Sequence, residues 1–269
     1  MADRFAAALN HAGLRAGQKI MIYIPNSIQW VVAWLGIQKM GAVSVPITPI
    51  YTPHDLKYIA DDSGAEAIVC ADTNFGYVTS VLPQTPLKKV IVTKMADLLP
   101  WWKRAFGYLF DIIPRGKIAL DENTYSFRRL LAQQRPSGPQ QPGNGPDGEA
   151  IAEILYTGGT TKFPKGVPFT HNLFLTSARE QITISESLFP PEQNVVLGNA
   201  PMFHILGQTC GLASLLVGGT VILLPKINLD AALDAIQRFK AKTMIGVPTL
   251  YRMILEHDRL DQYDLSSVD

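Results

Sequence analysis

The chain has 269 residues, of which 47% are hydrophobic and 17% charged, a composition that supports a large buried core and excludes global disorder. Its 24 lysines and arginines nearly balance 23 aspartates and glutamates, so the net charge of +1 does not favour a nucleic-acid partner. The two cysteines, Cys70 and Cys210, cannot form a disulfide framework, and no Cys or His spacing indicates zinc. With no apolar signal segment at the start, the sequence predicts a cytoplasmic protein with reduced thiols.

The first part of the chain alternates between predicted strands and helices. Strands are expected at residues 19–24, 42–47, 66–70 and 88–93, and helices at 3–12, at 27–40 and from 53 onward. Thr52 is placed to cap the last of these helices, with Pro53 at its first position. The strand starts are 22 to 24 residues apart, which fits compact β-α-β units and therefore a parallel sheet.

The alternation is interrupted at residues 94–117, an apolar segment with five basic and two acidic residues. The pair Trp101 and Trp102 lies beside Lys103 in this segment, a combination typical of membrane interfaces. A helix packed on its own lobe is the alternative. Residues 136–148 then hold four prolines and four glycines, which predicts a linker or an exposed loop.

The alternation resumes after this linker. Strands are predicted at 150–156, 195–199, 220–224 and 243–246, and helices from 171 and at 206–217, 230–241 and 248–257. The predicted fold class is α/β, with two lobes of mainly parallel sheets flanked by helices. We expect a first lobe at 1–135, a linker at 136–149 and a second lobe at 150–269, with ligands bound at the carboxyl ends of the strands.

The loop after the strand predicted at 150–156 contains three threonines, three glycines and two lysines. Glycines let backbone N–H groups approach an anion closely, while threonine hydroxyls and lysine ammonium groups add donors and charge. The pattern predicts a polyphosphate site, with an ordinary polar turn as the alternative. The candidate binding residues are Tyr156, Thr157, Gly158, Gly159, Thr160, Thr161, Lys162, Phe163, Pro164, Lys165 and Gly166.

Residues 156–167 resemble the phosphate-binding signature of the AMP-forming acyl-CoA synthetases, within the adenylate-forming superfamily. Lys162 departs from that signature, which has Gly at this position. Residues 201–204, Pro-Met-Phe-His, are similar to the family's aromatic-His motif. Further similarity lies at residues 26–27, 41–47 and 247–249, so the resemblance covers essentially the whole chain.

The resemblance implies ATP-dependent activation of a carboxylic acid. The carboxylate would attack the α-phosphate of ATP to give an acyl-adenylate and pyrophosphate, and the CoA thiolate would then displace AMP. ATP and Mg²⁺ are the implied cofactors, CoA is the co-substrate, and Thr157 is the implied Mg²⁺ contact. Lys165 and His204 are the implied catalytic residues; for His204, gating or positioning is favoured over direct acid–base work.

Among such ligases, the apolar and basic segment 94–117 resembles an insertion of bacterial-type long-chain fatty-acid ligases, which favours a long-chain fatty acid as the substrate. Peripheral contact of this segment with the inner face of the membrane stays open beside the packed helix. An aryl-acid ligase, a peptide-synthetase adenylation domain, and a non-catalytic lobe that binds nucleotide or membrane are the alternatives. Family enzymes are much longer, with adenine-binding and ribose-binding elements and a C-terminal lobe that carries a catalytic Lys. We therefore expect an N-terminal portion that is inactive alone; homo-oligomerisation stays open.

Overall fold

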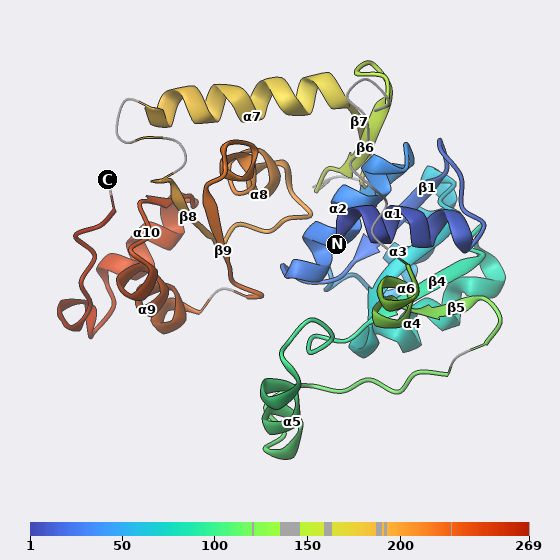
Figure 1. The fold of residues 1–269 in the computed structure, drawn as a ribbon, viewed down its shortest axis with the longest axis horizontal. Coiled ribbons are helices and arrows are strands. Elements are labelled where there is room, and N and C mark those ends of the chain that lie inside the picture. Colours follow the sequence, from blue (N-terminus) through green and yellow to red (C-terminus); the bar gives the residue numbers. More distant parts are fainter. Residues whose placement is uncertain are drawn as a thin grey trace. The chain divides into compact units, whose positions relative to one another are not determined.

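The computed structural model describes residues 1–119, 121–134, 146–158, 163–186, 190, 193–226 and 228–268. The chain divides into two compact units (Figure 1). The first comprises Met1–Ile24 and Ile28–His171, and the second comprises Pro25–Ser27 and Asn172–Asp269. Each unit contains a sheet whose strands are mostly parallel, so the predicted α/β class is confirmed.

The first unit is built on a seven-stranded sheet with the order β5-β4-β3-β1-β2-β6-β7. Its strands are β1 (Lys19–Tyr23), β2 (Val43–Pro46), β3 (Ala67–Ala71), β4 (Lys89–Thr93), β5 (Thr124–Ser126), β6 (Ile151–Tyr156) and β7 (Gly166–Thr170). All neighbouring pairs run parallel except β6 and β7, which form an antiparallel hairpin. The four strands predicted in the first part of the chain are confirmed as β1 to β4, whereas β5 and β7 were not predicted.

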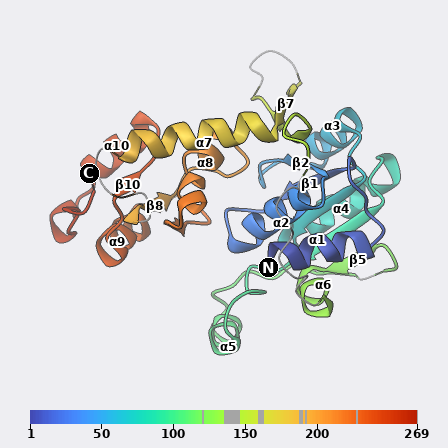
Figure 2. The same cartoon turned by 45° about the horizontal axis from the view of Figure 1, so that its top comes forward.

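Helices cover both faces of this sheet (Figures 1 and 2). One group of packed helices contacts β1, β2, β4 and β5; it consists of α1 (Ala2–His11), α2 (Ile28–Lys39) and α6 (Phe127–Gln133). A second group consists of α3 (Pro53–Ser63) and α4 (Phe75–Val81), which pack together, and α4 contacts β3. Successive side chains of a strand point to opposite faces, so Met21 and Tyr23 of β1 join the core cluster of α3 and α4. Ile20 and Ile22, which are also fully buried, therefore face the α1–α2 side.

Helix α3 begins where the sequence predicts. The Asp55 carboxylate accepts hydrogen bonds from both the backbone N–H of Thr52, at 2.8 Å, and its hydroxyl, at 2.7 Å. Pro53 occupies the first turn, and Gly64 ends the helix with a φ of 65°. Both ends of α3 are thus fixed by local chemistry, which matters because this helix contacts the candidate site.

The boundary between the units differs from the predicted linker. β6 and β7 belong to the sheet of the first unit, where Ser44 of β2 pairs with Glu153 of β6, and this unit extends to His171. Burial explains the difference, because Ala152 and Leu155 of β6 complete the core of the first sheet. The proline- and glycine-rich segment therefore precedes the last two strands of this sheet. Residues 135–145 themselves lie outside the described part.

The second unit contains a three-stranded parallel sheet in the order β10-β8-β9. Its elements are α7 (His171–Glu186), which begins at the boundary, β8 (Val195–Gly198), α8 (Ile205–Thr209), β9 (Thr220–Leu223), α9 (Leu229–Phe239), β10 (Thr243–Met244) and α10 (Pro248–Leu255). The single helix predicted at 206–217 is wrong: a short α8 is followed by a separate 3-10 helix, Ala213–Val217. Gly211 lies between the two pieces, and glycine is a poor residue for a helix interior.

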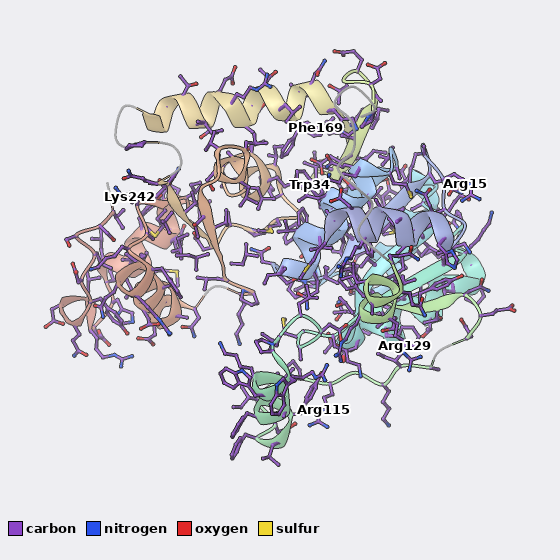
Figure 3. The ribbon with its side chains drawn as sticks, viewed as in Figure 1. Arg15, Trp34, Arg115, Arg129, Phe169 and Lys242 are labelled. Atoms are coloured by element: carbon purple, nitrogen blue, oxygen red, sulfur yellow. The ribbon has the colours of Figure 1, made fainter. Side chains whose placement is uncertain are left out.

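The segment 94–117 contains α5 (Trp101–Leu109), which is shorter than the stretch between Pro100 and Pro114. The helix ends just before Asp111, whose φ of 53° is incompatible with helix continuation. Arg115 returns toward α5 and lies over the Tyr108 ring at 4.5 Å (Figure 3). None of the helices in the described part of the chain has both the length and the apolar composition that a membrane span needs.

Candidate phosphate-binding site

The predicted phosphate loop connects the two strands of the β6–β7 hairpin. Tyr156 pairs with Gly166 at the end of the ladder. Beyond this pair, the Thr157 N–H donates to the Lys165 carbonyl at 3.0 Å, and the Lys165 N–H donates to the Thr157 hydroxyl at 3.4 Å. Thr157, Gly158 and Lys165 are all exposed. The Thr157 hydroxyl and the backbone of the exposed Lys165 are therefore held together at the mouth of the loop, next to Gly158.

Helix α3 braces this loop through aromatic and polar contacts. The Tyr58 hydroxyl donates to the Pro164 carbonyl at 2.9 Å, and the Tyr58 ring stacks on Phe163 with centroids 4.5 Å apart. One helical turn further on, Asp62 accepts a hydrogen bond of 2.6 Å from the Tyr156 hydroxyl. Partial burial, together with the Asp62 carboxylate, raises the pKa of Tyr156 above its ordinary value. Tyr156 therefore remains a neutral donor at physiological pH.

Four of the predicted loop residues, Gly159, Thr160, Thr161 and Lys162, lie outside the described part of the chain. Their assignment to phosphate binding therefore stays a prediction. The described ends of the loop, at Thr157–Gly158 and from Phe163 onward, come together in one hairpin.

The donors that are described fit a polyphosphate better than a metal held by protein alone. Thr157 offers one exposed hydroxyl oxygen, and the described residues include no group of three His, Cys, Asp or Glu side chains that could hold a metal ion. Mg²⁺ prefers six oxygen ligands and keeps several waters. A Mg²⁺ ion at Thr157 would thus need most of its ligands from phosphate oxygens and water.

The second unit holds the other predicted catalytic residue, His204. It caps α8, and its Nδ1 accepts a hydrogen bond of 3.2 Å from the Leu206 N–H. The exposed imidazole therefore uses Nδ1 as an acceptor toward its own helix and leaves Nε2 free of this bond. The structure thus gives His204 a clear local role in fixing the start of α8.

The segment that precedes His204 is held by Asn26, which belongs to the same unit. The Asn26 amide donates to the Ala200 carbonyl at 2.8 Å, and its oxygen accepts from the Met202 N–H at 2.9 Å. Asn26 is buried, so these two bonds fix the backbone of residues 200–202. Sequence reasoning noted residues 26–27 only as part of the resemblance, because a contact between residues 174 and 176 positions apart leaves no local signal.

The braces Tyr58 and Asp62 were also missed by sequence reasoning. They lie four positions apart on α3, so their side chains share one face of the helix. That spacing is the one local sign that they act together. Nothing in the sequence around them points to a loop that begins about 100 residues later.

The whole chain, residues 1–269, matches the family model described as AMP-binding enzyme. The chain belongs to this family. A long-chain-fatty-acid–CoA ligase of Bacillus subtilis (strain 168) is 30% identical over 272 residues, which are 98% of this chain and 47% of that protein. This chain therefore spans about half the length of the curated relatives that it matches.

Solved structures share the fold. An anthranilate CoA ligase in complex with anthranoyl-AMP superimposes with a TM-score of 0.82 at 24% identity, covering 99% of this chain and 47% of that one. A long-chain-fatty-acid–CoA ligase from Archaeoglobus fulgidus gives a TM-score of 0.76 at 23% identity, covering 100% and 48%. At these identities the similarity establishes the α/β architecture of the adenylate-forming ligases.

Proposed function

We propose that this chain is the ATP-binding portion of an AMP-forming acyl-CoA ligase. The observation that carries the proposal is the β6–β7 hairpin, which brings Thr157 and Lys165 together at one exposed loop mouth. The family to which the chain belongs, named for AMP binding, supports the same assignment.

In this proposal the loop binds the β- and γ-phosphates of ATP. When the fatty-acid carboxylate attacks the α-phosphate, negative charge accumulates on the departing pyrophosphate. Lys165 and the loop N–H groups would stabilise that charge, because donors aimed at developing charge need no reorganisation. Thr157 would contact Mg²⁺, and His204 would position the α8 region of the second unit.

We propose a long-chain fatty acid as the substrate class. Two features support it: the similarity to the Bacillus subtilis ligase, and the exposed apolar side chains around α5, which suit a protein that meets its substrate at a lipid surface. An aryl acid is the alternative that a test must separate. CoA is the proposed acceptor of the acyl group.

Binding measurements test both parts of the proposal without requiring turnover. Titration calorimetry with MgATP should show binding to the 269-residue chain, and no detectable binding would overturn the nucleotide assignment. The acid class is tested with non-hydrolysable sulfamoyl-adenosine analogues of the acyl-adenylate. We expect the palmitoyl analogue to bind more tightly than the anthranoyl analogue, and the reverse order would favour an aryl-acid ligase.

The α3 brace leads to a prediction for the same titration. Tyr58→Ala removes both the stacking on Phe163 and the hydrogen bond to Pro164, so the loop loses its main described support. We expect MgATP affinity to fall roughly threefold to tenfold, given typical values for one aromatic pair and one hydrogen bond. Tyr58→Phe, which keeps the ring, should lose less. The control is Tyr77→Ala, an exposed position on α4, and equal affinities for the two Ala variants would contradict the brace.

Peripheral membrane contact is proposed for the α5 region. Large apolar side chains there are exposed to solvent: Trp101, Trp102, Phe106, Leu109, Phe110 and Ile112. Burial of these side chains in a lipid interface would remove apolar area from water, and Lys103 next to the tryptophans would meet the headgroups. The packed-helix alternative predicts the opposite, namely buried tryptophans; Trp101 is 76% exposed.

Replacement of both tryptophans tests this contact. We expect the double variant Trp101→Ser, Trp102→Ser to lower co-sedimentation with phosphatidylcholine–phosphatidylglycerol vesicles severalfold, because the amphipathic tryptophan ring favours the membrane–water interface. A matched control is Met253→Ser with Leu255→Ser, two exposed apolar positions on α10. If the tryptophan variant sediments like the wild type, α5 is not the docking element.

A further inference from the structure

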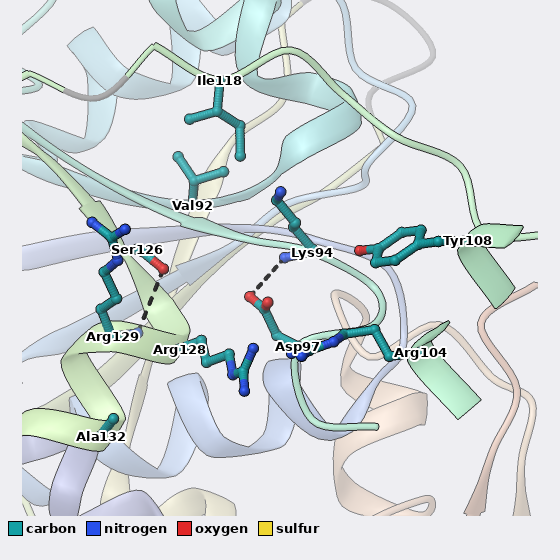
Figure 4. Close-up of a pocket in the computed structure, with 10 residues that line it drawn as sticks. All are labelled: Val92, Lys94, Asp97, Arg104, Tyr108, Ile118, Ser126, Arg128, Arg129 and Ala132. Carbon is teal, nitrogen blue, oxygen red and sulfur yellow. Dashed lines mark hydrogen bonds between the residues drawn. The ribbon is translucent and has the colours of Figure 1, made fainter. Parts of the chain in front are cut away.

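A cavity of about 640 Å³ lies in the first unit, apart from the phosphate loop (Figure 4). It opens where β4 and β5 end, with Val92 and Ser126, which pair across the two strands, in its wall. The segment after β4, helix α5 and helix α6 supply the other walls. In the sheet order, β3, β1 and β2 lie between the β5–β4 pair and the β6–β7 hairpin, so this is a second site.

The lining of the cavity is strongly cationic. Four of the lining residues are Lys94, Arg104, Arg128 and Arg129, and the one lining carboxylate is Asp97, which gives a net charge of +3 (Figure 4). These cations come from three separate parts of the unit: the turn after β4, helix α5 and helix α6. Like charges gathered in this way repel one another unless an anion lies between them.

The Asp97 carboxylate holds a turn and forms no ion pair of 4.0 Å or less within the described residues. Its carboxylate accepts hydrogen bonds from the Lys94 backbone N–H at 2.9 Å and from the Thr93 hydroxyl at 3.2 Å, so it fixes the turn after β4. Within the described residues, none of the ion pairs of 4.0 Å or less involves Asp97 or any of the four cations. The cationic side chains therefore remain available to a ligand.

We propose that this cavity binds the phosphate group of an anionic ligand. Three of its four cations are guanidinium groups, whose planar fork of N–H donors matches the oxygens of a phosphate. Lys94 adds a point charge, and the Tyr108 hydroxyl in the wall adds a further polar group. The site lies at the carboxyl ends of parallel strands, where ligands of α/β proteins bind.

The phosphate can come from a water-soluble anion or from a phospholipid headgroup. Helix α5 favours the headgroup, because the same helix supplies Arg104 to the cavity and exposes aromatic side chains to solvent. A lipid bound there would place its phosphate in the cavity while α5 contacts the bilayer. This inference rests on the cavity and its charges and does not depend on ATP chemistry.

The test uses a cavity variant in which both arginines of α6 are replaced, Arg128→Gln together with Arg129→Gln. It is compared with a control variant that loses the same charge. The control is Arg4→Gln with Lys88→Gln, because Arg4 and Lys88 are exposed residues of the same unit outside the cavity wall. In the first arm, inorganic phosphate is titrated into the isotope-labelled chain, and backbone amide resonances of residues 94–97 and 126–129 are followed. In the second arm, vesicles of phosphatidylcholine with and without phosphatidylglycerol are sedimented with each variant.

We expect the cavity variant, but not the control, to lose about tenfold in affinity for phosphate or for the phosphatidylglycerol vesicles, given the strength of charge-assisted hydrogen bonds. Arg128→Lys with Arg129→Lys keeps the charges and should retain part of the binding. Shifts with inorganic phosphate indicate a soluble ligand, whereas binding seen only with vesicles indicates a headgroup; either supports the site. Equal binding by the cavity and control variants in both arms would overturn it.

Discussion

Lys165→Ala should lower the affinity of the chain for MgATP by roughly 10- to 100-fold, the range expected for losing one hydrogen bond to a charged group. Lys165 carries the one ammonium group among the described residues of the β6–β7 loop. Its backbone is fixed in both directions by Thr157, so its position at the loop mouth does not depend on its own side chain. Replacement by Ala should therefore remove the charge while the hairpin stays formed.

Controls separate this effect from a general loss of positive charge. Lys88→Ala removes an exposed lysine of the same unit whose ion pair with Glu66 spans 3.6 Å, and it should leave MgATP affinity unchanged. Lys165→Arg retains the charge but not the compact ammonium geometry, so we expect intermediate affinity. Wild-type affinity in Lys165→Ala would show that the phosphates bind elsewhere.

The strands of the first unit show what the sequence could predict. β1 to β4 are apolar runs whose predicted starts are 22 to 24 residues apart, so their pattern was sufficient. β7 was missed because Gly166 and Pro168 argue against a strand, yet β7 lies at the edge of the sheet, where proline costs no ladder bond to a further strand. β5 has only three residues, too few to show a periodicity.

The candidate site shows the same division between local and long-range information. The composition of the loop predicts its chemistry, because glycine, threonine and lysine act there through their own backbone freedom and donors. Its support by Tyr58 and Asp62 of α3 depends on how the sheet brings α3 to the hairpin. The cationic cavity was missed for that reason too, since Lys94 and Arg129 are separated by 35 positions and meet only because β4 pairs with β5.

Phe5→Ala should destabilise the first unit by about 3–5 kcal/mol, the range for deleting a buried aromatic side chain. The Phe5 ring is fully buried and packs on Phe127 of α6 with centroids 4.9 Å apart. It also fills the space left by Gly36 of α2, where a Cβ atom would lie 2.8 Å from the ring. One side chain thus connects α1, α2 and α6. Its loss leaves a cavity that these three helices cannot fill by moving together, because each is also packed on the sheet or on its neighbours.

Against a typical total stability of about 5–15 kcal/mol, such a loss leaves little reserve. Hydrogen exchange of the β1 and β4 amides measures the stability of the first unit alone. The free energy of opening of these amides should fall by about the 3–5 kcal/mol expected for Phe5→Ala. Phe106→Ala is the matched control, because this phenylalanine is 57% exposed on α5 and its removal should change protection by less than about 0.5 kcal/mol. Since α6 also carries Arg128 and Arg129, exchange there should rise in Phe5→Ala as well, and phosphate binding in the cationic cavity should weaken with it. Unchanged protection in β1 and β4 would mean that α1 is not an integral part of this core.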